Sequence, residues 1–328
     1  MSVFPVTEST LSAEHLAAFL RQQYGLGSNT TCTLFRKGMN HVYMVQDGAT
    51  GYVLRIYSHN WRTPVEIAEE LRWMMMAQAS ISVPKVIEDQ EGKFLQAFQA
   101  PEGQRYGVLF SKAPGKKDAR FSKEASHNIG QAMAKLHRQA EGITLERTTY
   151  NTQILHKDAI AGIREFFPEP TPTRLFMDKL SQWLPMVYSQ VDEDQVRSGA
   201  VHLDIWFDNL HIHDDQQVTI FDFDFCGNGW LVHDVSYFLY QLFYTHPDPK
   251  AYEEKAIAFL EGYEKHLTLS PAERNLLPTA CLSIMLFYLH TQIQTFDNFS
   301  NVFMSHDHLT RNMMSMQRWM EYHELSLP

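Results

Sequence analysis

The sequence predicts an α+β protein with a small sheet-rich N-terminal part and a larger helical C-terminal part. Strand-like runs of β-branched, aromatic and apolar residues fill residues 31–57 and 82–110. Beyond residue 117 apolar residues recur at helical spacing in one segment after another. A length of 328 residues with 44% hydrophobic residues suits one large or two medium domains.

The N-terminal part should hold one short helix, a sheet and one main helix. Residues 12–23 have the pattern of a short amphipathic helix, and residues 31–57 read as three strands of an antiparallel meander. Thr63-Pro64-Val65-Glu66 combines an N-cap Thr, Pro at the first helical position and Glu at the third, which predicts a helix start. Further strands are expected over residues 82–87, 94–99 and 106–110.

One carboxylate of that main helix falls on its apolar face. Glu70 follows Ile67 by three residues and precedes Met74 by four, so it lies at the buried stripe. A carboxylate there needs a partner. Arg55, in the middle of the third strand, is the candidate, and the alternative is that Glu70 is a solvated helix charge.

The C-terminal part begins after a short linker, Ala113-Pro114-Gly115-Lys116-Lys117. A cleft between the two parts is where a ligand would be expected. Residues 296–307 are expected to form an irregular loop. The expected helices span residues 123–137, 174–188, 235–244, 251–265, 278–294 and 309–324.

Composition narrows the classes of function. The chain carries 38 acidic against 28 basic residues, and its longest basic cluster is Lys116-Lys117, so no nucleic-acid partner is expected. The acidic balance leans towards a cationic small molecule. Three scattered cysteines indicate a reducing compartment, and the N-terminus lacks the pattern of a signal peptide. The longest strongly apolar stretch, Cys281–Leu289, is about half a membrane span. A cytoplasmic protein without a membrane partner is expected.

The most informative stretch spans residues 200–234. Two apolar runs, Leu210–His213 and Val218–Phe223, flank four polar residues and predict a β-hairpin. The first strand runs four residues away from Asn209 and the second runs five residues back, so at about 3.3 Å per residue Asp222 should lie near Asn209. Asp204 lies on the loop before the first strand. Carboxylate and amide oxygens gathered there suit Mg²⁺ and a phosphate.

Several neighbours of this hairpin have alternative interpretations. Asp224 is either a second metal ligand or a solvated neighbour of Asp222, because two residues along a strand face the same side. His202 is expected to pack beneath the loop. His211 and His213 invite a zinc site, which would need a third protein ligand. Asp234 either caps a helix beginning at Val235 or braces the loop.

These residues resemble a known family. The pattern His202-x-Asp204-x4-Asn209, followed by Phe221-Asp222-Phe223-Asp224, is similar to the signature of the aminoglycoside phosphotransferase/choline kinase-like family, which has a protein-kinase-like fold. The resemblance covers roughly residues 30–295, and bacterial stress-response and homoserine-kinase-like members look closest in layout. It implies a nucleotide-binding lobe over residues 1–110, a hinge over 111–116 and a helical catalytic and substrate lobe over 117–328.

The resemblance also implies a function. The chain would be an ATP- and Mg²⁺-dependent phosphotransferase for a hydroxyl of a small molecule. Asp204 would be the catalytic residue that orients the acceptor hydroxyl, and Asn209 and Asp222 would hold the metal. The ion pair of Arg55 with Glu70 would bind the phosphates of the nucleotide. The turn containing Gly38 and Asn40 would cover these phosphates, and the hinge backbone at Ser111 and Ala113 would contact the adenine.

Three departures from the family pattern leave an alternative open. Leu203 stands where such enzymes usually have glycine, Arg55 stands for the usual lysine, and the phosphate-covering turn has only Gly38. This alternative is a catalytically weak nucleotide-binding module of the same fold. Independently of these departures, a protein Ser/Thr kinase of the stress-response type and a zinc hydrolase using His211 and His213 are also alternatives. Homoserine, choline-like amines, aminoglycosides and amino-sugar adducts all remain open as acceptors, and so does the oligomeric state.

Overall fold

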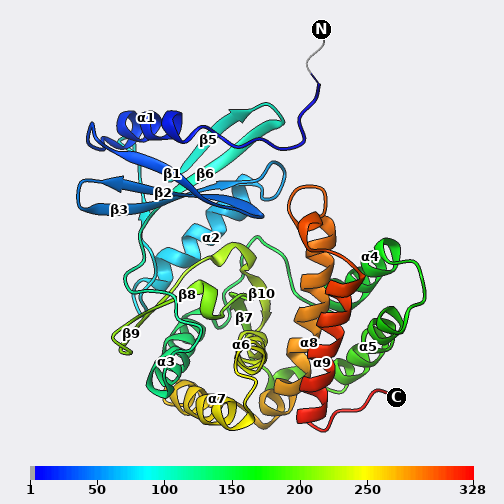
Figure 1. The fold of residues 1–328 in the computed structure, drawn as a ribbon. Helices are drawn as coiled ribbons and strands as arrows, with labels where there is room; N and C mark the ends of the chain where they lie inside the picture. Colours follow the sequence, from blue (N-terminus) through cyan, green and yellow to red (C-terminus); the bar gives the residue numbers. More distant parts are fainter. Residues whose placement is uncertain (1–3) are drawn as a thin grey trace. The chain divides into compact units, whose positions relative to one another are not determined.

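A computed structural model describes residues 4–328 and divides the chain into two compact units. The first comprises the residues up to Ala79 together with Val83–Ala113. The second comprises Ser80–Ser82 and Pro114–Pro328. The chain passes from the first to the second unit between Ala113 and Pro114. The first unit is mostly strand and the second mostly helix, so the predicted α+β class is confirmed (Figure 1).

The first unit is built on a six-stranded antiparallel sheet in which β1, β2, β3, β6 and β4 are neighbours in that order and β5 pairs with β6. The predicted meander of three strands is confirmed. The strand expected over residues 82–87 shrinks to two residues, since Pro84 has no N–H to donate to a ladder. The elements are α1 (Ala13–Tyr24), β1 (Thr31–Lys37), β2 (Asn40–Asp47), β3 (Thr50–Tyr57), α2 (Pro64–Ala77), β4 (Val86–Ile87), β5 (Leu95–Ala100) and β6 (Gly103–Ser111).

Burial of one sheet face against α1 makes the core of this unit. Leu16 and Leu20 of α1 pack with Tyr43 and Leu54 of the sheet, and all four side chains are buried. The start of α2 is the one that the sequence predicts, because both arms of the capping box of Thr63 are formed. The apolar residues Ile67, Leu71 and Met74 then set which face of α2 is buried, and with it the position of Glu70.

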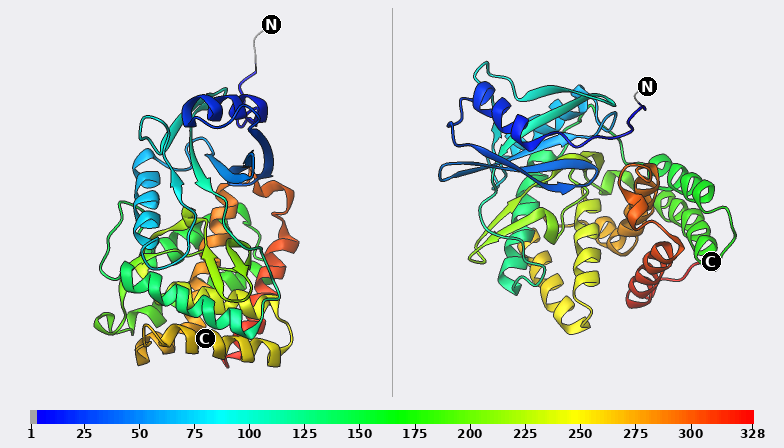
Figure 2. Two further views of the ribbon diagram at one scale, coloured as in Figure 1. Left: turned by 90° about the vertical axis from the view of Figure 1, so that its left-hand side faces the viewer. Right: turned by 45° about the horizontal axis from the view of Figure 1, so that its top comes forward.

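The second unit is mainly helical. Helices α3 and α7 lie side by side, as the views in Figures 1 and 2 agree. A Cβ on Gly130 of α3 would stand 2.0 Å from the carbonyl oxygen of Phe259, so only glycine allows this approach. The helices are α3 (Lys123–Ala140), α4 (Ala159–Phe166), α5 (Pro172–Ser189), α6 (Val232–Thr245), α7 (Pro249–Glu264), α8 (Pro271–Gln294) and α9 (His306–Tyr322).

Two short antiparallel pairs accompany these helices. The expected hairpin forms from β8 (Leu210–His213) and β9 (Gln217–Ile220). A second pair, β7 (Ser198–Val201) with β10 (Gly227–Trp230), is absent from the sequence prediction. Its sequences, SGAV and GNGW, contain three glycines and little β-propensity, so tertiary packing decides that they are strands.

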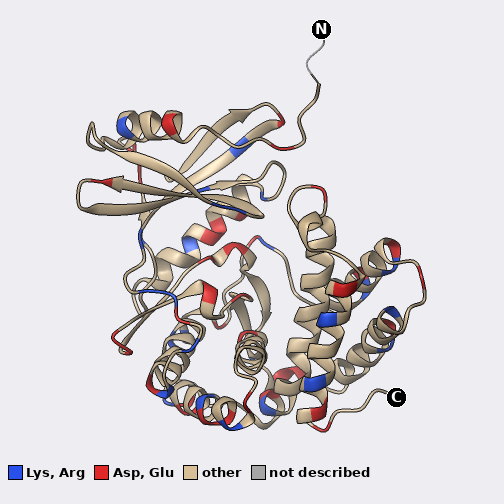
Figure 3. Cartoon of the chain, viewed as in Figure 1, with Lys and Arg blue, Asp and Glu red and all other residues tan. Residues whose placement is uncertain are grey.

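The structure extends α8 beyond its predicted start. It begins at Pro271 instead of Pro278, because Ser270 and Glu273 form a capping box. After Arg274 it carries no charged residue, as Figure 3 shows. By length and composition this helix resembles a membrane span, but 56% of its most apolar window is buried inside the protein, which is typical of a core helix.

Candidate active site

The β8–β9 hairpin brings together the two predicted metal ligands. Leu210 pairs with Ile220, and the N–H of Phe221 donates to the carbonyl of Asn209 at 3.1 Å. Asp222 follows directly, with left-handed backbone angles of φ 66° and ψ 64°. The strand therefore ends at Ile220 and not at the predicted Phe223.

Asn209 is fixed by the residue proposed as catalytic. Its amide nitrogen donates to Oδ2 of Asp204 at 2.7 Å and to the carbonyl oxygen of Asp204 at 3.0 Å. Because both bonds leave from the nitrogen, the orientation of the amide is set, and Oδ1 of Asn209 is the atom that suits a metal ion. Asn209 is only 6% exposed, so this orientation is held in a packed environment.

Asp204 lies in a strongly perturbing environment. Burial, followed by the charge of Asp222, raises the pKa of the Asp204 carboxyl to about 8, although the hydrogen bonds from Tyr237 and Asn209 work in the opposite direction. A divalent cation would relieve the repulsion between the two carboxylates. The oxygens of Asn209 and Asp222 are hard donors of the kind Mg²⁺ takes, so these residues fit this ion.

The loop before Asp204 is braced by a buried carboxylate. Asp234 accepts hydrogen bonds from the N–H of His202 at 2.9 Å and from the N–H of Leu203 at 2.6 Å. Of the two alternatives for Asp234, bracing the loop is confirmed. The capping alternative is wrong, because α6 begins at Val232 and Asp234 lies inside its first turn.

Asp234 is itself anchored by α3. Nε2 of His137 lies 3.0 Å from Oδ2 of Asp234, and Nδ1 of His137 contacts the hydroxyl of Tyr263 at 2.8 Å. Burial alone would raise the pKa of Asp234, but the contact with His137 and the backbone hydrogen bonds hold it below its usual value. The brace is therefore a charged carboxylate. His202 packs 4.5 Å from the ring of Phe223, as predicted.

Leu203 adopts the backbone conformation that a glycine would take. Its φ is 67°, in the left-handed region, and its side chain is fully buried. The sequence left open whether leucine would give this loop a different shape. The structure shows that leucine accepts the left-handed conformation, with hydrogen bonds at both its N–H and its carbonyl.

Burial and packing bear on the alternative interpretations of Asp224, His211 and His213 near the hairpin. Asp224 is 3% exposed, so the interpretation as a solvated neighbour is wrong. The ring of His211 packs against Phe221 at 4.9 Å, while the side chain of His213 is 58% exposed. Within residues 4–328 no group of three or more His, Cys, Asp and Glu side chains is placed to hold a metal ion, which gives the zinc interpretation no support.

In the first unit, Arg55 and Glu70 form the predicted ion pair. Nη1 of Arg55 lies 2.6 Å from Oε1 of Glu70, and the hydroxyl of Tyr57 donates to Oε2 at 2.9 Å. Glu70 is fully buried and Arg55 is 7% exposed, so the alternative of a solvated Glu70 is wrong. The guanidinium also lies over the ring of Phe110 at 5.2 Å.

The other predicted nucleotide contacts lie at two turns of the same unit. The N–H of Gly38 donates to the carbonyl of Asn40 at 3.1 Å and closes the β1–β2 turn. The N–H of Ser111 donates to the carbonyl of Lys85 at 2.8 Å, so Ser111 would have to use its carbonyl to contact an adenine. Ala113 is the last residue of the unit and is 9% exposed.

Two tyrosines next to Asp204 were not among the predicted site residues. The hydroxyl of Tyr237 donates to Oδ1 of Asp204 at 3.1 Å, and that of Tyr288 donates to the carbonyl of Leu203 at 3.1 Å. From the sequence both belong to a set of aromatic residues expected in the core, some of which could instead line an acceptor pocket. The only available signal was the position of Tyr237, three residues and so nearly one turn after Asp234 on α6.

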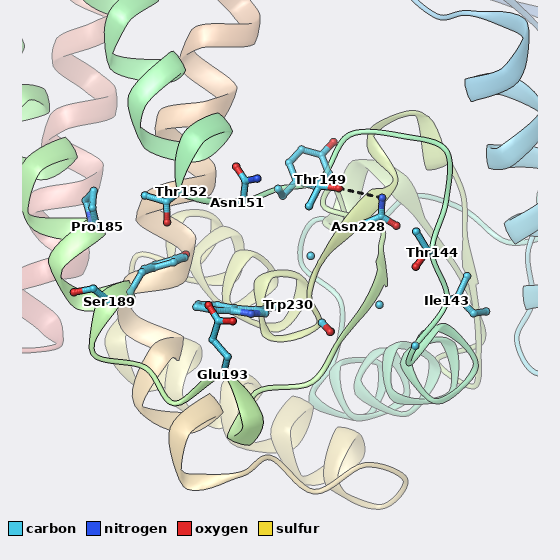
Figure 4. A pocket seen from close by; sticks show the side chains of 16 residues that line it. Ile143, Thr144, Thr149, Asn151, Thr152, Pro185, Ser189, Glu193, Asn228 and Trp230 are labelled. Atoms are coloured by element: carbon cyan, nitrogen blue, oxygen red, sulfur yellow. Dashed lines mark hydrogen bonds between the residues drawn. The ribbon is translucent and has the colours of Figure 1, made fainter.

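The second unit also contains a cavity of about 640 Å³ beside β7, β10 and the end of α5 (Figure 4). Tyr188 stacks on Trp230 there, with ring centroids 4.9 Å apart. None of the predicted catalytic or metal-binding residues lines this cavity. Its lining is mostly small, hydroxyl-bearing and aromatic, and consists of Gly142, Ile143, Thr144, Thr149, Tyr150, Asn151, Thr152, Pro185, Tyr188, Ser189, Glu193, Ser198, Gly199, Asn228, Gly229 and Trp230.

The fold defines the class of protein. A sheet-rich unit followed by a helical unit is the arrangement of the protein-kinase-like phosphotransferase fold. Residues 31–269 match the model of the phosphotransferase enzyme family, and the chain belongs to this family.

The individual relatives share only about a quarter of their residues with this chain. An amicoumacin kinase of Bacillus subtilis is 26% identical over 282 residues, which cover 84% of this chain and 81% of that protein. A homoserine kinase of Gluconobacter oxydans is 23% identical over 296 residues, covering 88% and 89%. Among solved structures, the amicoumacin kinase hAmiN in complex with AMP-PNP, Ca²⁺ and Ami superposes with a TM-score of 0.75 at 21% identity, covering 95% of this chain and 94% of that one. This likeness establishes the fold.

Proposed function

We propose that the protein is an ATP- and Mg²⁺-dependent kinase that phosphorylates a hydroxyl group of a small molecule. The observation that carries the proposal is the carboxylate of Asp204, held by the amide of Asn209, whose backbone in turn accepts a hydrogen bond from Phe221, the residue before Asp222. Phosphoryl transfer needs positioning and neutralisation of charge more than covalent help from the protein. Asp204, Asn209 and Asp222 supply groups for both tasks.

The residues have distinct roles in this proposal. Asp204 accepts a hydrogen bond from the acceptor hydroxyl and orients its oxygen towards the γ-phosphorus. Oδ1 of Asn209 and the carboxylate of Asp222 hold Mg²⁺, which supplies positive charge to the phosphates when bound. Asp234 does not contact the reactants; it keeps the loop of Asp204 in place.

The first unit supplies the nucleotide contacts. Arg55, oriented by Glu70, binds the phosphates, and the turn containing Gly38 and Asn40 covers them. Buried salt-bridged guanidinium groups are well suited to this role because Arg presents several donors in a planar array. The backbone carbonyl of Ser111 and the backbone of Ala113 receive the adenine.

The names of the relatives guide the choice of acceptors. An ADP-release assay with Mg²⁺-ATP would use amicoumacin, homoserine, choline and kanamycin, together with a protein acceptor such as casein. The expected result is acceptor-dependent ADP release with at least one small molecule and none with casein. Asp204→Asn protein is the control for contaminating activity.

Two other outcomes would favour the alternatives. Mg²⁺-dependent ATP binding without turnover across a broad panel of hydroxyl compounds would indicate a nucleotide-binding module. Phosphorylation of casein alone would indicate a protein kinase. The left-handed conformation of Leu203 argues against the first of these, since the departure from glycine leaves the backbone of the loop in the conformation that glycine would adopt.

A further inference from the structure

Two tyrosines from different helices reach the same short segment of the catalytic loop. Tyr237 projects from α6 and Tyr288 from α8. Their hydroxyls lie 3.1 Å from Oδ1 of Asp204 and 3.1 Å from the carbonyl oxygen of Leu203, respectively. The two rings are stacked, with centroids 5.5 Å apart and planes 28° apart.

Tyr237 completes the fixation of the Asp204 carboxylate. Asn209 holds Oδ2, and the torsion at the end of an aspartate side chain is soft, so one donor leaves the plane of the carboxylate free to turn. A second donor on Oδ1 removes that freedom. Burial and the charge of Asp204 raise the pKa of Tyr237 well above its usual range, so its phenol keeps the proton that it donates.

Tyr288 acts on the peptide that precedes Asp204. The N–H of Leu203 is held by Asp234 and its carbonyl by Tyr288, so both ends of this left-handed residue are hydrogen-bonded. The ring of Tyr288 also meets Phe225 edge-on at 5.1 Å, in the segment that follows Asp222. One side chain therefore contacts both the acceptor-orienting loop and the metal-binding loop.

We propose that Tyr237 and Tyr288 are positioning residues for phosphoryl transfer, which hold the carboxylate of Asp204 and the backbone before it in the orientation that the acceptor hydroxyl requires. The inference rests on the proposed role of Asp204. Neither tyrosine takes part in bond making or breaking. Both act through Asp204, so their loss should lower turnover without weakening the binding of ATP.

The test uses conservative Tyr→Phe variants of the full chain. Tyr237→Phe and Tyr288→Phe each remove one hydroxyl, and Tyr240→Phe is the matched control. Tyr240 lies on α6 as well, is 2% exposed, and donates its hydroxyl to Ser315 instead of to the catalytic loop. Two experiments are needed. ADP release, with the acceptor found above or with water, gives kcat and the KM for ATP. Hydrogen exchange is followed at the amides of residues 202–206.

The expected results separate positioning from general stability. Tyr237→Phe should lower kcat by about 10- to 100-fold, the effect of losing one hydrogen bond to a charged group, and should change the KM for ATP by less than about twofold. Tyr288→Phe should lower kcat and also raise the exchange rate of residues 202–206 several-fold. Tyr240→Phe should leave kcat, KM and exchange in this segment unchanged.

Other outcomes would overturn the inference. Unchanged kcat in both active-site variants, or an equal loss of kcat in Tyr240→Phe, would leave the tyrosines as ordinary core residues. If the wild-type protein shows no turnover, the exchange measurement decides the positioning role by itself. In that case unchanged exchange in Tyr288→Phe refutes the inference, whereas absent turnover counts against the proposed function.

Discussion

The backbone N–H of Leu203 lies 2.6 Å from Oδ1 of Asp234, a residue 31 positions further along the chain. The same carboxylate binds the N–H of His202 and contacts His137 of α3. A charged, fully buried side chain thus holds the peptide groups directly before Asp204. This bond stabilises a leucine in a backbone conformation that usually requires glycine.

The strain at Leu203 can be measured with two substitutions. Leu203→Ala and Leu203→Gly both remove a fully buried side chain, and each should cost about 2–5 kcal/mol. In ordinary backbone, glycine is less stable than alanine by about 0.5–1 kcal/mol. At φ 67° alanine keeps a left-handed strain of about 1–2 kcal/mol, so Leu203→Gly should be at least as stable as Leu203→Ala in urea unfolding.

Leu210 provides the reference for that comparison. It is 1% exposed and has an ordinary extended φ of −127°. Leu210→Ala should therefore be more stable than Leu210→Gly. If the alanine variant were more stable than the glycine variant at both positions, Leu203 would carry no backbone strain.

Removal of the charge of Asp204 should affect turnover far more than nucleotide binding. Asp204→Asn is expected to lower kcat by roughly 10²–10⁴, the usual contribution of a positioned acid or base, with the dissociation constant of Mg²⁺-ATP nearly unchanged. Asp214→Asn is the control, because the side chain of Asp214 is 86% exposed on the turn of the same hairpin. Wild-type turnover in Asp204→Asn would contradict the assigned role.

Asp222 should control the dependence of nucleotide binding on metal. Asn suits its left-handed backbone better than Ala does, so Asp222→Asn removes the charge without adding backbone strain. Titration calorimetry with ATP should show tight binding only with Mg²⁺ in the wild-type protein, and no Mg²⁺-dependent gain in the variant. An equal gain in both proteins would exclude Asp222 as a metal ligand.

The Arg55–Glu70 pair should affect stability through the balance of two buried charges, and ATP binding through the guanidinium of Arg55 alone. Glu70→Gln leaves the guanidinium of Arg55 buried without its carboxylate, and breaking a buried pair in this way costs about 3–5 kcal/mol. Replacing both residues by apolar ones, Arg55→Met with Glu70→Leu, should recover much of this loss in urea unfolding. ATP affinity should stay low in the double variant, and its recovery would refute phosphate binding by Arg55.

The pKa of Asp204 predicts a pH dependence of stability in metal-free protein. It is raised from 3.8 to about 8 in the folded state, so between these values the folded protein binds a proton that the unfolded chain releases. Stability should therefore fall as the pH rises from about 4 to 8. Melting temperatures recorded in EDTA should show this slope in the wild-type protein and a shallower slope in Asp204→Asn; equal slopes would contradict the prediction.

Local spacing determined much of the fold and most of the candidate site. The capping box at Thr63 specifies where α2 begins, and the apolar residues at helical spacing specify that Glu70 faces the core. The hairpin spacing places Asn209 opposite Phe221 and so brings Asp222 close to it. Each of these features lies within a single helix or a single hairpin, where backbone geometry leaves few alternatives.

Contacts between distant residues needed the tertiary structure. Whether Asp234 capped a helix or braced a loop depended on α6 beginning at Val232. The contacts of Tyr237 and Tyr288 with the loop of Asp204 depended on how α6 and α8 pack. The left-handed backbone of Leu203 likewise rests on partners 31 and 85 positions away. Sequence alone therefore identified the candidate site residues, whereas long-range packing decided which side chains hold them in place, because burial and hydrogen bonding between separate helices leave no local pattern.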